Sequence, residues 1–148
     1  MDEDLQLNAH LELLIKQISS DLSAIALIDQ NNKIRWRYMF GNMNERYRHM
    51  VTKPGLGISG QVIRFGRTVI IDQIHSSTEL ARGQFPIMLA EQLLAAIAVP
   101  LLNNNRIVGV LLVGDREKRL YNMEDIHHVE KARERILAIM PREHIQIK

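Results

Sequence analysis

Two strongly apolar segments in the second half of the chain, Ala95–Leu101 and Ile107–Gly114, constrain the fold more than any other feature of the sequence. Both are rich in residues that favour strands, and the asparagine run Asn103–Asn105 between them favours a turn. We expect an antiparallel hairpin at the centre of a sheet, with both faces covered. A second hairpin, Ser23–Asp29 with Ile34–Phe40, indicates that neighbouring strands pair locally.

Amphipathic helices are expected at both ends of the strand region. From Leu5 to Leu22 apolar residues recur every three or four positions, which is typical of a helix with one buried face. Near the C-terminus Asn122 is a favourable N-cap, Asp125 occupies the third helical position, and Pro141 follows the last apolar residue of the helix. Locally paired strands between two helices predict an α+β fold with the terminal helices together on one face of the sheet.

The length of 148 residues predicts a single domain over 1–148. Its expected parts are an N-terminal helix (1–22), a core of sheet and pocket (23–121) and a C-terminal helix (122–140). Within the core we expect further short elements: helices at Asn44–Met50, Ile58–Phe65 and Met88–Leu93, a strand at Thr68–Asp72, and an irregular stretch that starts at Ser76.

Composition excludes several classes of protein. The chain has no cysteine, which removes disulfides, thiolate metal sites and cysteine nucleophiles, and which suits a reducing cytoplasm. The 19 Lys and Arg residues against 17 Asp and Glu leave a net charge of +2, and aromatic residues make up only 5%, so direct nucleic-acid binding is not expected. The acidic start and the broken apolar runs predict neither a secretion signal nor contact with a membrane. We therefore expect a cytoplasmic protein.

The segment Gly55–Gly60 has the letters of a dinucleotide-binding fingerprint but not its context. That fingerprint follows a parallel strand, and Met50–Pro54 does not read as one. A glycine-rich loop that opens a helix still leaves free backbone N–H groups and the positive end of the helix dipole at one point, where a small anion can bind. The alternative is that the glycines only shape a tight turn.

The remaining candidate residues do not form a catalytic set. The single tryptophan, Trp36, is expected on the opposite strand face from Arg35 and Arg37, either as a core aromatic or as the wall of a pocket. The six histidines lack the spacing of a metal site. Asp72 and Asp115 end predicted strands, where turn and capping roles are usual. Since no nucleophile with a base is recognisable either, we expect no enzymatic activity, no metal and no cofactor.

Four segments in this order resemble the GAF family: Gly57–Val62 followed by Gly66, Val69–Asp72, Ala98–Leu101 and Ile107–Leu111. The resemblance covers Asp21 to His128. It implies a sensor domain with a central antiparallel sheet, terminal helices on one face, and short helices and loops over a ligand pocket on the other. Within the family the chain is most similar to a free-standing nitrate-sensing domain that acts with an oxygen-sensing histidine kinase and its response regulator.

This resemblance implies a binding site for nitrate. The amides of Ile58 and Ser59, with a further amide from Ile87 or Met88, would bind the anion. An aromatic wall of Trp36 and Phe85 would exclude water. The ligand would order the middle of the chain and change the surface that meets the kinase. The full set implied is Trp36, Leu56, Ile58, Ser59, Gly60, Phe85, Pro86, Ile87 and Met88.

One alternative is excluded at this point, and two remain open. A stand-alone methionine sulfoxide reductase of the same family relies on cysteines, which this chain lacks. A GAF domain for a cyclic nucleotide or another organic ligand would need a larger cavity with polar groups that converge on the ligand. A ligand-free interaction module would form a homodimer through the apolar stripes of the terminal helices, and such a homodimer is also compatible with sensing.

Overall fold

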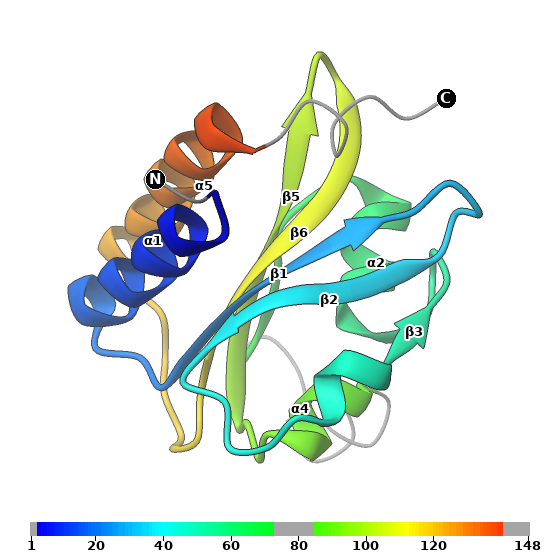
Figure 1. Ribbon diagram of the computed structural model, residues 1–148. Coiled ribbons are helices and arrows are strands. Elements are labelled where there is room, and N and C mark those ends of the chain that lie inside the picture. The colour runs from blue at the N-terminus through cyan, green and yellow to red at the C-terminus, as the bar shows by residue number, and fades with distance from the viewer. Residues whose placement is uncertain (1–2, 73–84, 141–148) are drawn as a thin grey trace.

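The computed structural model of the protein describes residues 3–72 and 85–140 (Figure 1). Within these ranges the elements in chain order are α1 (Glu3–Ile18), β1 (Leu22–Ile28), β2 (Ile34–Phe40), the 3-10 helix η1 (Arg46–His49), β3 (Val51–Thr52), α2 (Gly57–Phe65), β4 (Val69–Ile71), α4 (Pro86–Ala90), β5 (Ala95–Asn103), β6 (Arg106–Asp115) and α5 (Met123–Ile139). The strands of this part of the chain form a six-stranded sheet in the order β3-β2-β1-β6-β5-β4, with every neighbouring pair antiparallel. The predicted α+β class is confirmed.

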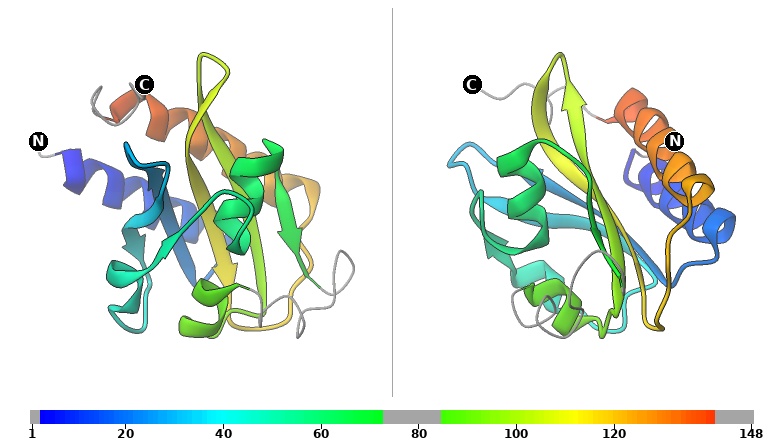
Figure 2. Two further views of the ribbon diagram at one scale, coloured as in Figure 1. Left: turned by 90° about the vertical axis from the view of Figure 1, so that its right-hand side faces the viewer. Right: turned by 180° about the vertical axis from the view of Figure 1, so that it is seen from behind.

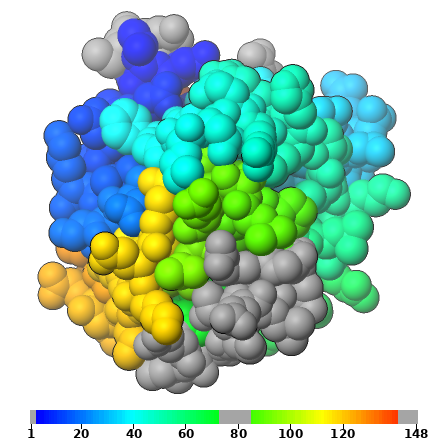
Figure 3. Space-filling model, turned by 90° about the horizontal axis from the view of Figure 1, so that it is seen from below, coloured from blue at the N-terminus to red at the C-terminus, as the bar shows by residue number. Residues whose placement is uncertain are grey.

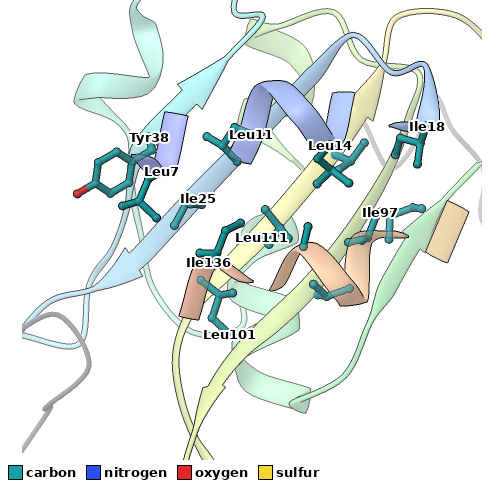
Figure 4. Packing of buried hydrophobic residues seen from close by; sticks show 14 of the residues in the cluster. Leu7, Leu11, Leu14, Ile18, Ile25, Tyr38, Ile97, Leu101, Leu111 and Ile136 are labelled. Carbon is teal, nitrogen blue, oxygen red and sulfur yellow. The ribbon is translucent and has the colours of Figure 1, made fainter. Parts of the chain in front are cut away.

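Helices cover both faces of the sheet. The terminal helices α1 and α5 lie side by side on one face, as predicted, and α2 and α4 lie on the other (Figures 1 and 2). On the first face Leu7, Leu11 and Leu14 of α1 are fully buried and pack with strand residues that include Ile25 and Leu111 (Figure 4). This packing uses the apolar stripe that the sequence pattern of α1 predicts.

The predicted end of the first helix at Leu22 is wrong. The helix stops at Ile18, and Ser19 has a φ of 54°, which turns the chain out of the helix. Leu22 then begins β1, and its buried side chain belongs to the core on the other face of the sheet. Leu22 has helical spacing to the apolar residues of α1 but lies in a strand, because its side chain is buried by the packing on the other face of the sheet.

The C-terminal helix begins as its sequence predicts. The Asn122 side chain accepts a hydrogen bond from the Asp125 amide at 2.8 Å, and the Asp125 carboxylate accepts one from the Asn122 amide at 3.0 Å. This reciprocal capping box satisfies two backbone donors that a helix start would otherwise leave unpaired. The helix ends at Ile139, with Met140 as its C-cap.

Both predicted hairpins are present. The first differs from the prediction in where its strand ends, and the second differs in its position within the sheet. The turn of the second hairpin uses Asn104 and Asn105 at φ 52° and 67°, as its asparagine run suggests. Its strands are not both central, because the middle pair of the sheet is β1 with β6, and β5 lies one position further out. In the first hairpin Asp29 lies outside the strand, and its carboxylate accepts hydrogen bonds from the amides of Asn31 at 2.9 Å and Lys33 at 3.0 Å.

The middle elements are shorter than predicted, apart from α2. The expected helix at Asn44–Met50 is the single turn η1. The expected helix at Met88–Leu93 is wrong, because Pro86 opens α4 two residues earlier and Gln92, at φ 56°, follows its end. The start of the irregular stretch at Ser76 lies outside the described residues.

Two further predictions concern the organisation of the chain. All described strands belong to one sheet, whereas the single-domain division of 1–148 stays a prediction. Among the helices of the described ranges, none combines the length and the apolar character that a bilayer crossing requires.

All three tyrosines of the chain are buried, and this predicts an unusual alkaline titration. Burial is the largest influence on each phenol: it raises the pKa of Tyr38 from 10.0 to about 12 and also raises the pKa of Tyr47 and of Tyr121. We therefore expect no tyrosinate absorbance step near pH 10 in the native protein, whereas the urea-unfolded protein shows one. For Tyr38 the folded state keeps its proton longer, so its contribution to stability is complete below pH 10 and is lost as the pH rises through about 12. A native tyrosine that ionises near pH 10 would contradict this burial.

Candidate ligand-binding site

Small side chains line the sheet face beneath α2 and α4. Four fully buried alanines on β1 and β5 share this face: Ala24, Ala26, Ala96 and Ala98. On the opposite face the neighbouring positions carry larger residues such as Ile25 and Ile97. Small residues at the middle of a sheet let the covering elements, or a small molecule between them, come close to the strands.

The chain enters α2 through a tight turn that requires its glycines. The Gly55 amide donates to the Gly60 carbonyl at 2.8 Å, and the Leu56 amide donates to the Lys53 carbonyl at 3.0 Å. Gly55 and Gly57 have φ values of 94° and 70°, which side-chain-bearing residues rarely adopt. A Cβ atom on Gly60 would lie only 2.5 Å from the carbonyl oxygen of Lys53. The turn-shaping role of these glycines is thus real.

The same turn also leaves backbone donors at the start of α2. The amides of Gly57, Ile58 and Ser59 have no hydrogen-bond acceptor within residues 3–72 and 85–140. The hydroxyl of Ser59 lies 3.4 Å from that of Thr52 on β3. Aligned peptide dipoles give this end of the helix a partial positive charge. A helix start with such donors is able to bind an anion.

A second helix start lies next to the first. A Cβ atom on Gly57 would be 3.9 Å from Cδ of Pro86, the first residue of α4. The Met88 amide donates to the Phe85 carbonyl at 2.9 Å. Of the two amides that the resemblance assigns to α4, the Ile87 amide is thus the one without an acceptor in the described part of the chain.

Five of the nine predicted site residues lie together in one buried cluster. They come from β2, α2, α4 and the N-cap residue of α4, and none exceeds 5% exposure: Trp36, Ile58, Phe85, Ile87 and Met88. As predicted, Trp36 is buried while its neighbours Arg35 and Arg37 are exposed. The cluster supplies apolar surface that includes the side chain of Ile58, near the start of α2.

The other four predicted residues have different roles. The Leu56 side chain is 60% exposed, and its amide is already bonded to Lys53, so Leu56 is not a buried member of this cluster. Gly60 shapes the turn, and Pro86 is exposed and has no amide hydrogen. Ser59 is 2% exposed and contributes its amide and its hydroxyl. The predicted residues thus fall into two groups: the buried cluster supplies apolar surface, and the turn supplies hydrogen-bond donors.

Sequence reasoning missed the polar contacts that hold α4. Oε1 of Glu91, whose side chain is fully buried, accepts hydrogen bonds from the Met43 amide and from Arg116 Nη2, both at 2.7 Å. Nε of Arg116 also donates to the Glu91 carbonyl at 2.9 Å, and Asn44 Nδ2 donates to the Ala90 carbonyl at 2.8 Å. Seen from below, the segments that carry these residues lie side by side (Figure 3). The end of α4 is therefore tied to the loop after β2 and to the end of β6.

A signal for this contact was present in the sequence. Glu91 is the single acidic residue between Phe85 and Gly114, in an otherwise apolar stretch. A lone carboxylate in such surroundings needs a cationic partner when it is buried. What the sequence did not show is that Arg116 would be that partner.

The nine predicted residues offer groups that can bind a ligand. None of the nine predicted residues has an acidic or basic side chain, so the arrangement presents backbone donors, one hydroxyl and apolar surface. Within the described residues, moreover, no three His, Asp or Glu side chains gather where they would hold a metal ion. This combination suits a small anion or polar molecule held by hydrogen bonds.

Solved structures similar to this chain include the NreA protein from Staphylococcus aureus, mutated in its nitrate binding site. It is 31% identical, with a TM-score of 0.70, over 81% of this chain and 93% of that one. The GAF domain of an Acinetobacter phosphoenolpyruvate-protein phosphotransferase is 14% identical, with a TM-score of 0.79, over 98% of this chain and 85% of that one. The free methionine-R-sulfoxide reductase of Neisseria meningitidis is 16% identical, with a TM-score of 0.74, over 93% and 77%. The last two show the fold alone.

No curated protein matches the chain. The match to a family model, however, agrees with these structures. The model of the GAF domain matches residues 3–131, which include the sheet and both faces described above. Together with the similarity to the Staphylococcus aureus protein, this match shows that the chain belongs to the GAF domain family.

Proposed function

We propose that this GAF domain is a nitrate sensor, and that the anion binds at the start of α2 beside α4 and Trp36. The observation that carries the proposal is the set of three amides at Gly57, Ile58 and Ser59 that have no acceptor in the described part of the chain. The similar Staphylococcus aureus protein has a nitrate binding site according to its description. That likeness supports nitrate as the anion.

The chemistry of nitrate fits such a site. Nitrate is a planar monoanion that accepts hydrogen bonds through its oxygens, and backbone amides at a helix start supply donors without a cationic side chain. Apolar walls such as Trp36 and Phe85 exclude water, which strengthens each hydrogen bond. The Ile87 amide of α4 is the fourth donor that we propose.

We propose a signalling role for this binding and no catalytic one. The ligand would bridge α2 and α4 and favour one arrangement of the surface around them, which a sensor histidine kinase would read. The difference in nitrate affinity between the two arrangements would set how far the ligand shifts the population that the kinase reads. The lack of cysteine fits a role in the cytoplasm. The homodimer through the terminal helices stays a prediction.

Trp36→Ala is expected to weaken nitrate binding by about tenfold or more, a loss of roughly 1.4 kcal/mol or more. The reason is that the variant opens the wall beside the α2 amides to water. Calorimetric titration of nitrate-free protein, in a buffer without competing anions, measures this change. Trp36→Phe is the matched variant: it keeps an aromatic wall and removes the indole N–H, so retained affinity would assign the effect to the wall.

Two outcomes would contradict the proposal. Folded wild-type protein that gives no saturable one-site binding of nitrate would end the nitrate assignment and leave the GAF fold intact. Tighter binding of chloride, nitrite or cyclic AMP in parallel titrations would point to a different ligand for the same domain.

A further inference from the structure

The helix α4 is too short to hold its own position. It comprises five residues, Pro86–Ala90, whereas isolated helices shorter than about 12–15 residues are marginal in water. The proposed function nevertheless needs this helix in one place, because it supplies the Ile87 amide and begins after Phe85. Apolar burial holds Phe85, Ile87 and Met88 in the core, but burial has no preferred direction. Hydrogen bonds that tether the helix can supply that direction.

Arg116 binds the C-cap residue of α4, Glu91, at two points. Its Nη2 donates to Oε1 of Glu91 at 2.7 Å, and its Nε donates to the Glu91 carbonyl at 2.9 Å. The Glu91 amide in turn donates to the Ile87 carbonyl at 3.1 Å. One hydrogen bond thus separates the residue that Arg116 binds from the residue whose amide we propose as a nitrate donor.

Arg116 is itself anchored outside α4. It directly follows Asp115, the last residue of β6, which is an inner strand of the sheet. Its amide donates to Oδ2 of Asp21, between α1 and β1, at 2.7 Å. Its Nη2 also donates to the carbonyl of Gly41, just after β2, at 3.0 Å. The guanidinium group therefore ties α4 to the end of the sheet, where these segments lie side by side (Figure 3).

The other tethers of α4 do not replace Arg116. The Met43 amide donates to the same Oε1 at 2.7 Å, and Asn44 Nδ2 donates to the Ala90 carbonyl at 2.8 Å, but neither donor is charged. The Glu91 side chain is fully buried, and its Oε2 has no hydrogen-bond partner in the described part of the chain, where Arg116 is the one cation within ion-pair distance. A buried carboxylate without its cation is strongly unfavourable. Without Arg116, Glu91 is expected to move toward water and to take the end of α4 with it.

We propose that Arg116 is a positioning residue of the nitrate site: it sets the place of α4, and thereby the direction of the Ile87 amide, with no contact of its own to the ligand. This inference rests on the proposed function. The guanidinium group suits the role, because its donors have a fixed planar arrangement and here bond three oxygen atoms, two of Glu91 and one of Gly41. A lysine at this position would keep the charge but not this arrangement.

Arg116→Met tests this role against a matched control, Arg119→Met. Both substitutions remove one positive charge, and the two arginine side chains have similar exposure, 24% and 22%. In the described part of the chain Arg119 bonds Asp115 and Asp125 and takes no part in the contacts of α4. By calorimetry Arg116→Met is expected to raise the Kd for nitrate about tenfold, and Arg119→Met less than about twofold. Arg116→Lys is expected to stay within about threefold of the wild type, because it keeps a cation beside Glu91.

Hydrogen exchange in the ligand-free protein tests the position of α4 independently of nitrate. The amides of Glu91, Gln92 and Leu93 donate to carbonyls of α4, and NMR can follow each of them. Arg116→Met is expected to speed their exchange about tenfold, and Arg119→Met to change it less than about twofold. Faster exchange confined to Arg116→Met would show that this arginine holds the helix end.

The two measurements separate this inference from the proposed function. Equal rises in Kd for the two methionine variants, or unchanged exchange at α4 in Arg116→Met, would overturn the positioning role. Wild-type protein that binds no nitrate but shows the expected exchange pattern would end the sensor proposal and leave Arg116 as the residue that positions α4. Circular dichroism checks that each variant is folded. If Arg116→Met does not fold, Arg116→Gln, which removes the charge and keeps an amide donor, repeats the test with a smaller expected rise in Kd.

Discussion

Asp115→Ala is expected to lower the free energy of unfolding by about 3–5 kcal/mol, because it removes one partner of a buried charged network. Oδ2 of Asp115 accepts hydrogen bonds from the Tyr121 hydroxyl at 2.8 Å, from the Ser20 hydroxyl at 3.0 Å and from Arg119 Nη1 at 3.3 Å. Arg119 and Tyr121 come from the segment between β6 and α5, and Ser20 comes from the segment between α1 and β1. The carboxylate thus joins the segments next to both terminal helices to the end of β6. Its loss leaves the buried donors without this acceptor.

Urea unfolding followed by circular dichroism measures this change. Tyr121→Phe removes one hydrogen bond and keeps the ring, so we expect a loss of about 1 kcal/mol for it. Glu117→Ala, at an exposed neighbouring position, is expected to stay within about 0.5 kcal/mol of the wild type. If Asp115→Ala costs no more than Tyr121→Phe, the carboxylate does not act as the centre of this network.

Gly60→Ala is expected to weaken nitrate binding by about tenfold or more, a loss of roughly 1.4 kcal/mol or more. The added Cβ would lie 2.5 Å from the Lys53 carbonyl oxygen and 3.1 Å from the Gly55 nitrogen. Both are backbone atoms, so the turn itself must move. The amides at the start of α2 move with it, because Gly60 belongs to the same helix. Calorimetric titration with nitrate measures the change.

The same substitution at the other end of α2 is its control. Gly66 is the C-cap at φ 65°, and a Cβ there would meet Ile107 Cδ1 at an ordinary 3.5 Å. Gly66→Ala is therefore expected to cost about 1 kcal/mol of stability from backbone strain, with nitrate affinity unchanged. If instead Gly60→Ala binds nitrate as the wild type does, the amides at the start of α2 are not the anion site.

The candidate site was only partly readable from the sequence. The glycine-rich turn and Trp36 were identified from local patterns, and the family resemblance supplied α4. Structure then showed that Met88 uses its amide for Phe85 and that the Leu56 side chain faces solvent. Neither fact follows from residue type, because both depend on the local path of the backbone. Thr52 beside Ser59 also went unnoticed, since it comes from a strand of only two residues.

The sequence by itself determined the elements whose energetics are local. The capping box of Asn122 with Asp125, the turn at Asn104 and Asn105, and the αL residue Gly66 each act within a few residues of the chain, so their patterns predict them. Periodicity likewise gave the buried stripe of α1, although not the end of that helix. These features specify an α+β chain with two hairpins between two helices.

Only the tertiary structure decided which distant residues meet. It set Gly57 beside Pro86, paired Arg116 with Glu91, and brought Ser20 to Asp115 across 95 positions of the chain. The physical reason is that these contacts join segments that only the packing of the two helical layers on the sheet brings together. Their energies depend on burial and geometry, which no local sequence pattern contains.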